Sequence, residues 1–252
     1  MNIKKDKEYL VRTDLILEQK PKIKIHEKKE NNISIIDSKI NRYKYTTIYF
    51  DDIEEKEKFK NLEEVFIKEI NKYLKLTKKD TILVIGLGNI KSTPDSLGPI
   101  TIDKIIPTRY LFELGEVKDY RNVAIYKPDV IGNTGIESIN IIKSIIKDIN
   151  PTKVIIIDAL KANNLNRLVK TIQITNSGIS PGSGINNKRG EISKKTIKKE
   201  VISIGIPTVV DIKSIIKEES SFIVTPTNID FVIESLSNLL SEGLNKIFHN
   251  KL

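Results

Sequence analysis

The run KVIIIDAL (153–160) decides how the rest of the chain can be interpreted. Its four consecutive β-branched residues are typical of a strand that is buried on both faces. TILVIGLG (81–88) and EVISIGIP (200–207) are two more runs of this kind, and segments with helical spacing of apolar residues lie between them. This alternation predicts an α/β domain with a mostly parallel or mixed sheet flanked by helices.

Further elements follow on either side of these strands. Apolar residues at helical spacing predict helices within 52–79, 136–149 and 229–248. Residues 32–51 contain two further β-like runs, and VKTIQIT (169–175) alternates as a half-exposed strand does.

The expected organisation is a single α/β domain over residues 15–252. Within it, 15–79 supplies an N-terminal arm, strands and a helix, and 80–252 forms the catalytic core. Residues 1–14 are polar and weakly patterned. They are interpreted as a removable leader, although the apolar pieces YLV and LILE also fit an ordinary edge strand.

The composition narrows the possible chemistry. The 252 residues include no cysteine, which excludes disulfides, thiol nucleophiles and thiolate zinc sites. The two histidines, His26 and His249, lie near opposite ends of the chain. If the protein is an enzyme, its acids and bases are therefore expected to be carboxylates or lysines.

The net charge of +9 is spread along the chain. Basic residues are not interleaved with aromatic ones, so direct binding of nucleic acid is not expected. No run of 18 apolar residues occurs, so no membrane span is expected. The start of the chain lacks the apolar segment of a secretory signal, which makes a cytoplasmic location the default expectation.

Two aspartates follow buried strands at the edge where ligand sites form in open α/β sheets. Asp158 comes directly after the apolar run of KVIIIDAL, and Asp95 lies in TPDSLGP, beyond TILVIGLG. Asp95 also fits a plain turn former. If the two strands are neighbours, the carboxylates can share a proton, so that one acts as acid and the other as base on a water.

Other patterns predict less. GLGN (86–89) resembles part of a dinucleotide fingerprint but lacks its third glycine. A metal site formed by Asp95, Asp158 and Glu137 would have no imidazole, and neither a metal nor a cofactor is predicted.

Two loops are candidates for substrate binding. Backbone N–H groups near residues 86–89 or 182–184 could complete an oxyanion site, and Gly88, Asn89, Gly182 and Ser183 are the predicted binding residues of these loops. Ser183 itself fits a loop residue better than a nucleophile, because GSG is not a nucleophile elbow. Lys188 and Arg189 could bind an acidic part of a substrate or form a solvated charge pair.

Together the motifs resemble the germination protease family, the spore endopeptidases. The motifs are LVRTDLILE, GLGNIKSTPDSLGP, PDVIGNTGIES, IIIDALKANNLNRLVKTIQITNSGISPGSGINNKR, ISIGIPTVVD and IVTPTNID, in this order. The resemblance implies an atypical aspartic endopeptidase, with a fold similar to hydrogenase-maturation peptidases, that degrades small acid-soluble spore proteins during germination. It also implies a zymogen, a homotetramer and a location in the forespore or spore core.

The resemblance assigns roles to particular residues. The family's two catalytic aspartates correspond to Asp95 and Asp158, and its processing point corresponds to the Asp14–Leu15 bond. Hydrogenase-maturation peptidases bind nickel with the help of a histidine, and no histidine lies near these motifs, so that metal is not carried over. A maturation-type peptidase with another protein target and a catalytically silent α/β binding protein remain alternatives.

Overall fold

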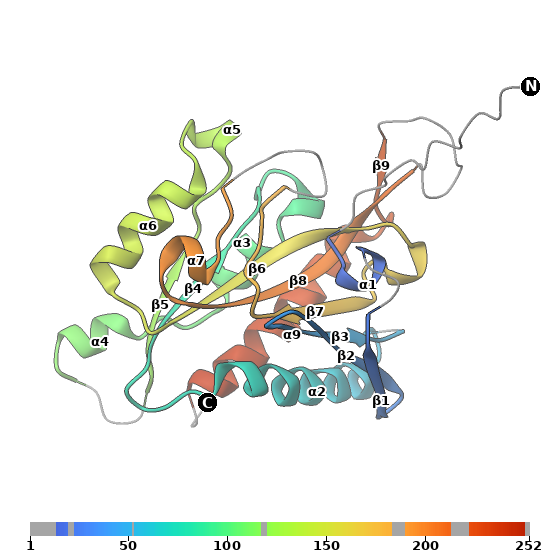
Figure 1. The fold of residues 1–252 in the computed structure, drawn as a ribbon, viewed down its shortest axis with the longest axis horizontal. Coiled ribbons are helices and arrows are strands. Elements are labelled where there is room, and N and C mark those ends of the chain that lie inside the picture. Colours follow the sequence, from blue (N-terminus) through green and yellow to red (C-terminus); the bar gives the residue numbers. More distant parts are fainter. Residues whose placement is uncertain are drawn as a thin grey trace, which may run out of the picture.

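The computed structural model of the protein describes residues 14–19, 23–51, 53–116, 120–182, 190–212 and 222–249. Its strands form one sheet in the order β1-β2-β3-β7-β8-β6-β4-β5, with β9 paired to β8. Helices cover both faces of this sheet (Figure 1). The predicted class, an α/β domain with a mixed sheet flanked by helices, is confirmed.

The bounds of the elements are as follows. The strands are β1 (Ile25–Glu30), β2 (Ile33–Ile40), β3 (Tyr43–Tyr49), β4 (Thr81–Gly86), β5 (Asn122–Tyr126), β6 (Lys153–Ala162), β7 (Thr171–Thr175), β8 (Glu200–Asp211) and β9 (Ile223–Val224). The α-helices are α1 (Ile16–Gln19), α2 (Lys56–Leu74), α3 (Leu97–Asp103), α4 (Arg109–Glu113), α5 (Ile131–Thr134), α6 (Ser138–Ile149), α7 (Lys194–Ile197) and α9 (Ile229–Phe248). Two short 3-10 helices are η1 (Thr93–Asp95) and η2 (Leu165–Arg167).

The sheet has a parallel half and an antiparallel half. Strands β5, β4, β6 and β8 pair in parallel, whereas β1, β2, β3 and β7 pair antiparallel. Strand β8 joins the halves, because it runs parallel to β6 and antiparallel to β7. The carboxyl ends of β4, β6 and β8 therefore open at one edge, where ligand sites of open α/β sheets form.

The core has two layers because successive side chains of a strand point to opposite faces. Ile82 and Val84 of β4 pack on the face covered by α2, α3 and α9. Leu83 and Ile85 belong to the cluster on the other face, which includes buried residues of α6 and α7. The isoleucine stripe predicted for 136–149 is present in α6, whose buried residues are Ser138, Ile139, Ile142 and Ile146.

Two strands differ from the expectations. Strand β1, with the sequence IHEKKE, has no apolar alternation and forms by pairing with β2. Strand β7 is buried along its whole length, not half-exposed. Its second face is covered by the N-terminal arm, since the Gln173 side chain bonds the backbone of both Asp14 and Ile16. This contact joins segments more than 150 residues apart, which a local pattern does not register.

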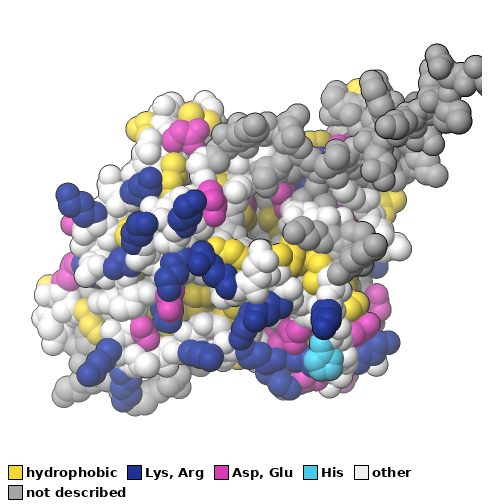
Figure 2. All heavy atoms as spheres, viewed as in Figure 1, with side chains coloured by type: hydrophobic (Ala, Val, Ile, Leu, Met, Phe, Trp, Pro, Cys, Tyr) yellow, Lys and Arg dark blue, Asp and Glu magenta, His cyan; other side chains and the backbone are white. Residues whose placement is uncertain are grey.

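One hydrophobic cluster includes residues from both 33–74 and 82–248. The division into an arm with strands over 15–79 and a catalytic core over 80–252 stays a prediction, and residues 1–13 of the predicted leader lie outside the described residues. Figure 2 shows Lys and Arg side chains spread over one face among Asp and Glu. Among the helices described, none has the length and apolar character needed to cross a membrane.

Candidate active site

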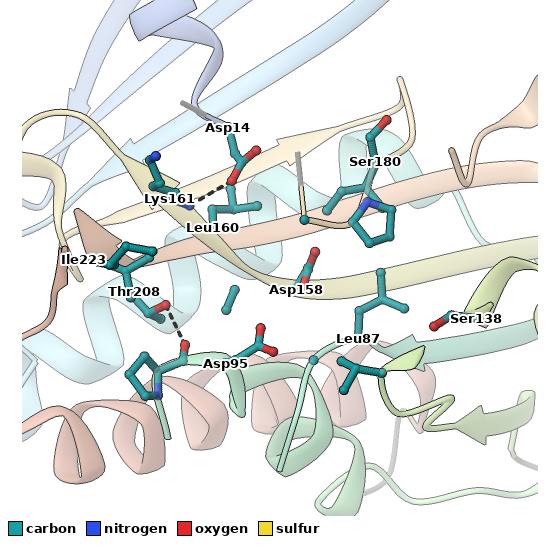
Figure 3. Close-up of a pocket in the computed structure, with 18 of the residues that line it drawn as sticks. Asp14, Leu87, Asp95, Ser138, Asp158, Leu160, Lys161, Ser180, Thr208 and Ile223 are labelled. Carbon is teal, nitrogen blue, oxygen red and sulfur yellow. Dashed lines mark hydrogen bonds between the residues drawn. The ribbon is translucent and has the colours of Figure 1, made fainter. Parts of the chain in front are cut away.

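A pocket of about 190 Å³ opens at the carboxyl ends of the parallel strands. Both predicted catalytic aspartates, Asp95 and Asp158, line it, together with residues of the arm, the β5–α5 connection and β8. Figure 3 shows the two carboxylates across this pocket, Asp158 on β6 and Asp95 on η1. The structure therefore brings together two groups that are 63 positions apart in the sequence.

Asp158 is placed by the central strand β6. The residue is 7% exposed, and in the sheet register it lies opposite Gly205 of β8. On the other edge of β6, the Leu87 N–H donates to the Ile157 carbonyl over 2.8 Å, so strand pairing continues up to the residue before Asp158. Asp158 is thus attached to a rigid element, which keeps its position well defined.

Asp95 is placed by the tight turn between β4 and α3. The Asn89 N–H donates to both the backbone carbonyl and Oδ2 of Asp95, each over 3.0 Å. Gly88 has a φ of +126°, and a Cβ added there would lie 1.9 Å from the Asp95 carbonyl oxygen. Only glycine allows this approach, so the glycine of GLGN serves the placement of Asp95.

The predicted substrate-binding residues have different outcomes. Gly88 and Gly182 line the pocket. The Asn89 N–H donates to Asp95, and the role of Asn89 in substrate binding stays a prediction. Ser183, Lys188 and Arg189 lie outside the described residues.

The predicted processing bond lies beside the pocket. Asp14 lines it, and its carboxylate accepts the Lys161 N–H over 2.9 Å while its own N–H donates to the Lys161 carbonyl over 3.1 Å. Leu15 is 1% exposed and packs with Leu160 and Ala162. The arm is therefore bound along the carboxyl end of β6.

The residues of the pocket lining that sequence reasoning missed include Asp129, Lys161 and Thr208. All three fall within segments at the carboxyl ends of predicted strands, 126–135, 158–165 and 205–211. The segments were therefore identifiable, although the individual residues were not. Lys161 lies three residues after Asp158 on β6 and forms a 3.1 Å ion pair with Asp211. Its exposed side-chain fraction is only 7%, which no local pattern indicates.

The considered acidic metal site is not assembled. Glu137 is absent from the described lining of the pocket, although its neighbour Ser138 is part of it. Within the described ranges, no group of three or more His, Cys, Asp or Glu side chains is arranged to hold a metal ion. Two carboxylates facing one pocket can act on a water held between them as base and acid.

Comparisons with known proteins agree on one family. Residues 4–224 match the model of the family described as germination protease. The germination protease of Priestia megaterium is 43% identical over 233 residues, which cover 89% of this chain and 60% of that protein. A Geobacillus germination protease is 43% identical over 188 residues, covering 72% of this chain and 48% of that protein. The chain thus spans between about half and 60% of the length of these relatives.

Solved structures give a more distant similarity. The NiFe hydrogenase maturation protease HycI from Thermococcus kodakarensis aligns with 70% of this chain and 98% of its own, at 15% identity and a TM-score of 0.41.

Proposed function

Because the chain belongs to the germination protease family, we propose that it is an endopeptidase. Its substrates would be small acid-soluble spore proteins, whose degradation it would begin during germination. The observation that carries the proposal is the pocket shared by Asp95 and Asp158. A pair of carboxylates can hydrolyse a peptide bond without thiol or imidazole, and this chain has no cysteine and no histidine among the residues that line the pocket.

In the proposed mechanism, one carboxylate of the pair removes a proton from a water, and the resulting hydroxide attacks the scissile carbonyl carbon. The other aspartate, in its protonated form, donates to the carbonyl oxygen. When the C–N bond breaks, the first aspartate gives its proton to the leaving amine, and the second recovers its proton from the diol hydroxyl. The pair titrates as a unit, so neither aspartate is assigned a single role.

Self-processing is part of the proposal. The arm would be cut at the Asp14–Leu15 bond, so that the zymogen loses residues 1–14. The placement of Asp14 on the pocket wall supports this, because the bond lies next to the proposed machinery. The mature enzyme would be a homotetramer in the spore core.

The proposal is tested by incubating a small acid-soluble spore protein with wild type, Asp95→Asn and Asp158→Asn. Wild type should cleave it, and each variant should lose at least ~1,000-fold in kcat, as for removal of a catalytic group. Asp148→Asn is the matched control, because Asp148 is exposed on α6 away from the pocket. Turnover retained by either pocket variant would reject the two-aspartate mechanism.

Two further measurements test self-processing and the choice of substrate separately. Mass spectrometry of wild type should show loss of residues 1–14, and Asp158→Asn should keep its full mass if the cut is made by the enzyme itself. If wild type cleaves neither a spore protein nor its own arm, the endopeptidase proposal fails. Cleavage of unrelated proteins at the same rate would argue against spore proteins as the dedicated substrate.

A further inference from the structure

Strand β8 is irregular beside the pocket. Leu160 of β6 pairs with Pro207, and the next residue, Lys161, pairs with Val209, so Thr208 is an extra residue without a partner on β6. One extra residue on one strand is the arrangement of a β-bulge, which is rare between parallel strands, turns side chains in new directions and is common next to active sites. Pro207 favours it, since proline has no N–H for a regular ladder.

The bulge places the Thr208 hydroxyl against the turn that carries Asp95. Thr208 is 1% exposed, and its hydroxyl donates to the carbonyl oxygen of Pro94 over 2.6 Å (Figure 3). That carbonyl belongs to the peptide unit that joins Pro94 to Asp95. Because the peptide unit is planar and φ of proline is fixed, holding this oxygen restrains the backbone that leads into Asp95.

Thr208 is itself held firmly. The Thr225 hydroxyl donates to its carbonyl oxygen over 2.8 Å, and β8 lies between β6 and β7 in the sheet. Asp158 lies opposite Gly205 in the register of β6 and β8, three residues before Thr208. The Thr208–Pro94 bond therefore ties the turn of Asp95 to the strand that neighbours Asp158.

We propose that Thr208 is a positioning residue that sets Asp95 at its working distance from Asp158. The inference rests on the proposed function, because the distance between the two carboxylates matters only if both act on one water. Both must reach one water, and a misplacement of about 1 Å can cost a rate of the order of 100-fold. The bond acts through Asp95, so Thr208 takes no part in proton transfer.

The test compares Thr208→Val, which removes the hydroxyl at nearly constant volume, with Thr208→Ser, which keeps it. Thr208→Val should lower kcat for spore-protein cleavage by ~10- to 100-fold with KM within about twofold of wild type. Thr208→Ser should retain most of the activity. Thr101→Val is the matched control, since Thr101 is also buried and donates to a backbone carbonyl, that of Leu97, and neither residue is in the described lining of the pocket.

Several outcomes overturn the inference. Normal kcat in Thr208→Val, at a temperature where thermal unfolding shows it to be folded, would mean that the hydroxyl is only structural. A raised KM with normal kcat would mean that it contacts substrate. Equal loss in Thr208→Ser would mean that the hydroxyl is not the group that matters.

A crystal structure of each variant tests the placement without substrate. The Asp95 carboxylate should move relative to Asp158 by more than ~0.5 Å in Thr208→Val and stay in place in Thr208→Ser. An unmoved Asp95 in Thr208→Val would reject the inference whatever the activity. Wild type that does not cleave spore proteins would instead reject the proposed function.

Discussion

The parallel and antiparallel halves of the sheet both have carboxylates on or beside their strands but use them differently. In the parallel half, β4, β6 and β8 all end at one edge, and polar residues in or after the carboxyl-terminal parts of these strands gather around one pocket. In the antiparallel half, neighbouring strands end at opposite edges, so polar residues after successive strands do not converge. Strand direction, more than residue type, thus decides where chemistry can be assembled.

Carboxylates in the antiparallel half serve packing. Glu69 of α2 is fully buried and its two oxygens accept from Lys28 and Lys72 over 2.7 and 2.5 Å. Asp37 accepts from the Thr46 hydroxyl over 2.6 Å. The two lysines satisfy the buried charge of Glu69, which burial of a charge requires, and Asp37 is half-buried. The comparison predicts that changes in the parallel half mainly affect catalysis and changes in the antiparallel half mainly affect stability.

Of the substitutions that compare the two halves, Gly88→Ala in the parallel half is expected to have the largest effect. The new methyl group would lie 1.9 Å from the Asp95 carbonyl oxygen, and the φ of +126° is unfavourable for alanine. The turn must move, so kcat should fall by at least ~100-fold. The fall in kcat is measured by steady-state kinetics, at a temperature where circular dichroism shows that the variant is folded. Activity within about threefold of wild type would show that the turn at Gly88 does not fix the position of Asp95.

The next effect is expected for Ile48→Ala in the antiparallel half. Ile48 of β3 is fully buried in the core under α2 and α9. Its truncation should lower the free energy of unfolding by ~2–5 kcal/mol through lost burial and a cavity, while kcat of the folded fraction stays near wild type. Urea titration measures the first and kinetics at low temperature the second. A lowered kcat in fully folded Ile48→Ala would show that the halves are coupled.

A smaller effect is expected for Asn133→Ala, beside the pocket. The Asn133 amide donates to Asn89 Oδ1 over 3.1 Å and to Asp129 Oδ1 over 2.9 Å, and so steadies the turn that holds Asp95. Since such bonds contribute about 0.5–1.5 kcal/mol, kcat should fall by ~2- to 10-fold. Asn140→Ala, an exposed asparagine of α6, is the control. Equal activity of the two variants would show that the hydrogen bonds of Asn133 do not affect catalysis.

The smallest effect concerns pH and lies away from the pocket. Burial lowers the pKa of His249, while its hydrogen bond to the Ile106 carbonyl opposes this and the Arg121 charge adds to it. Because the folded state disfavours the proton, stability should be complete above the unfolded pKa of about 6.5 and decline as pH falls below it. Thermal unfolding from pH 7.5 to 5 should show a shallower decline for His249→Gln. Identical slopes would contradict this.

The sequence anticipated the parallel half well. The apolar runs at 81–88, 153–160 and 200–207 are present as β4, β6 and β8, and the predicted helix 229–248 matches α9. Such runs are long, local and strongly apolar, so the pattern alone identifies them. Strand β1 was missed because a charged edge strand has no such pattern and depends on its partner β2.

Some features of the candidate site could likewise be predicted from the sequence, and others could not. By itself, the sequence determined that acid–base chemistry is expected from carboxylates or lysines and that Asp95 and Asp158 come after strongly apolar runs, because composition and hydrophobic period are local properties. Only the tertiary structure decided that Asp14 bonds the backbone of β6 and that Lys161 is buried beside Asp211. It also decided that the extra residue of β8 places the Thr208 hydroxyl against the Pro94 carbonyl. These contacts join residues 50 to 147 positions apart, and close packing of whole elements selects them.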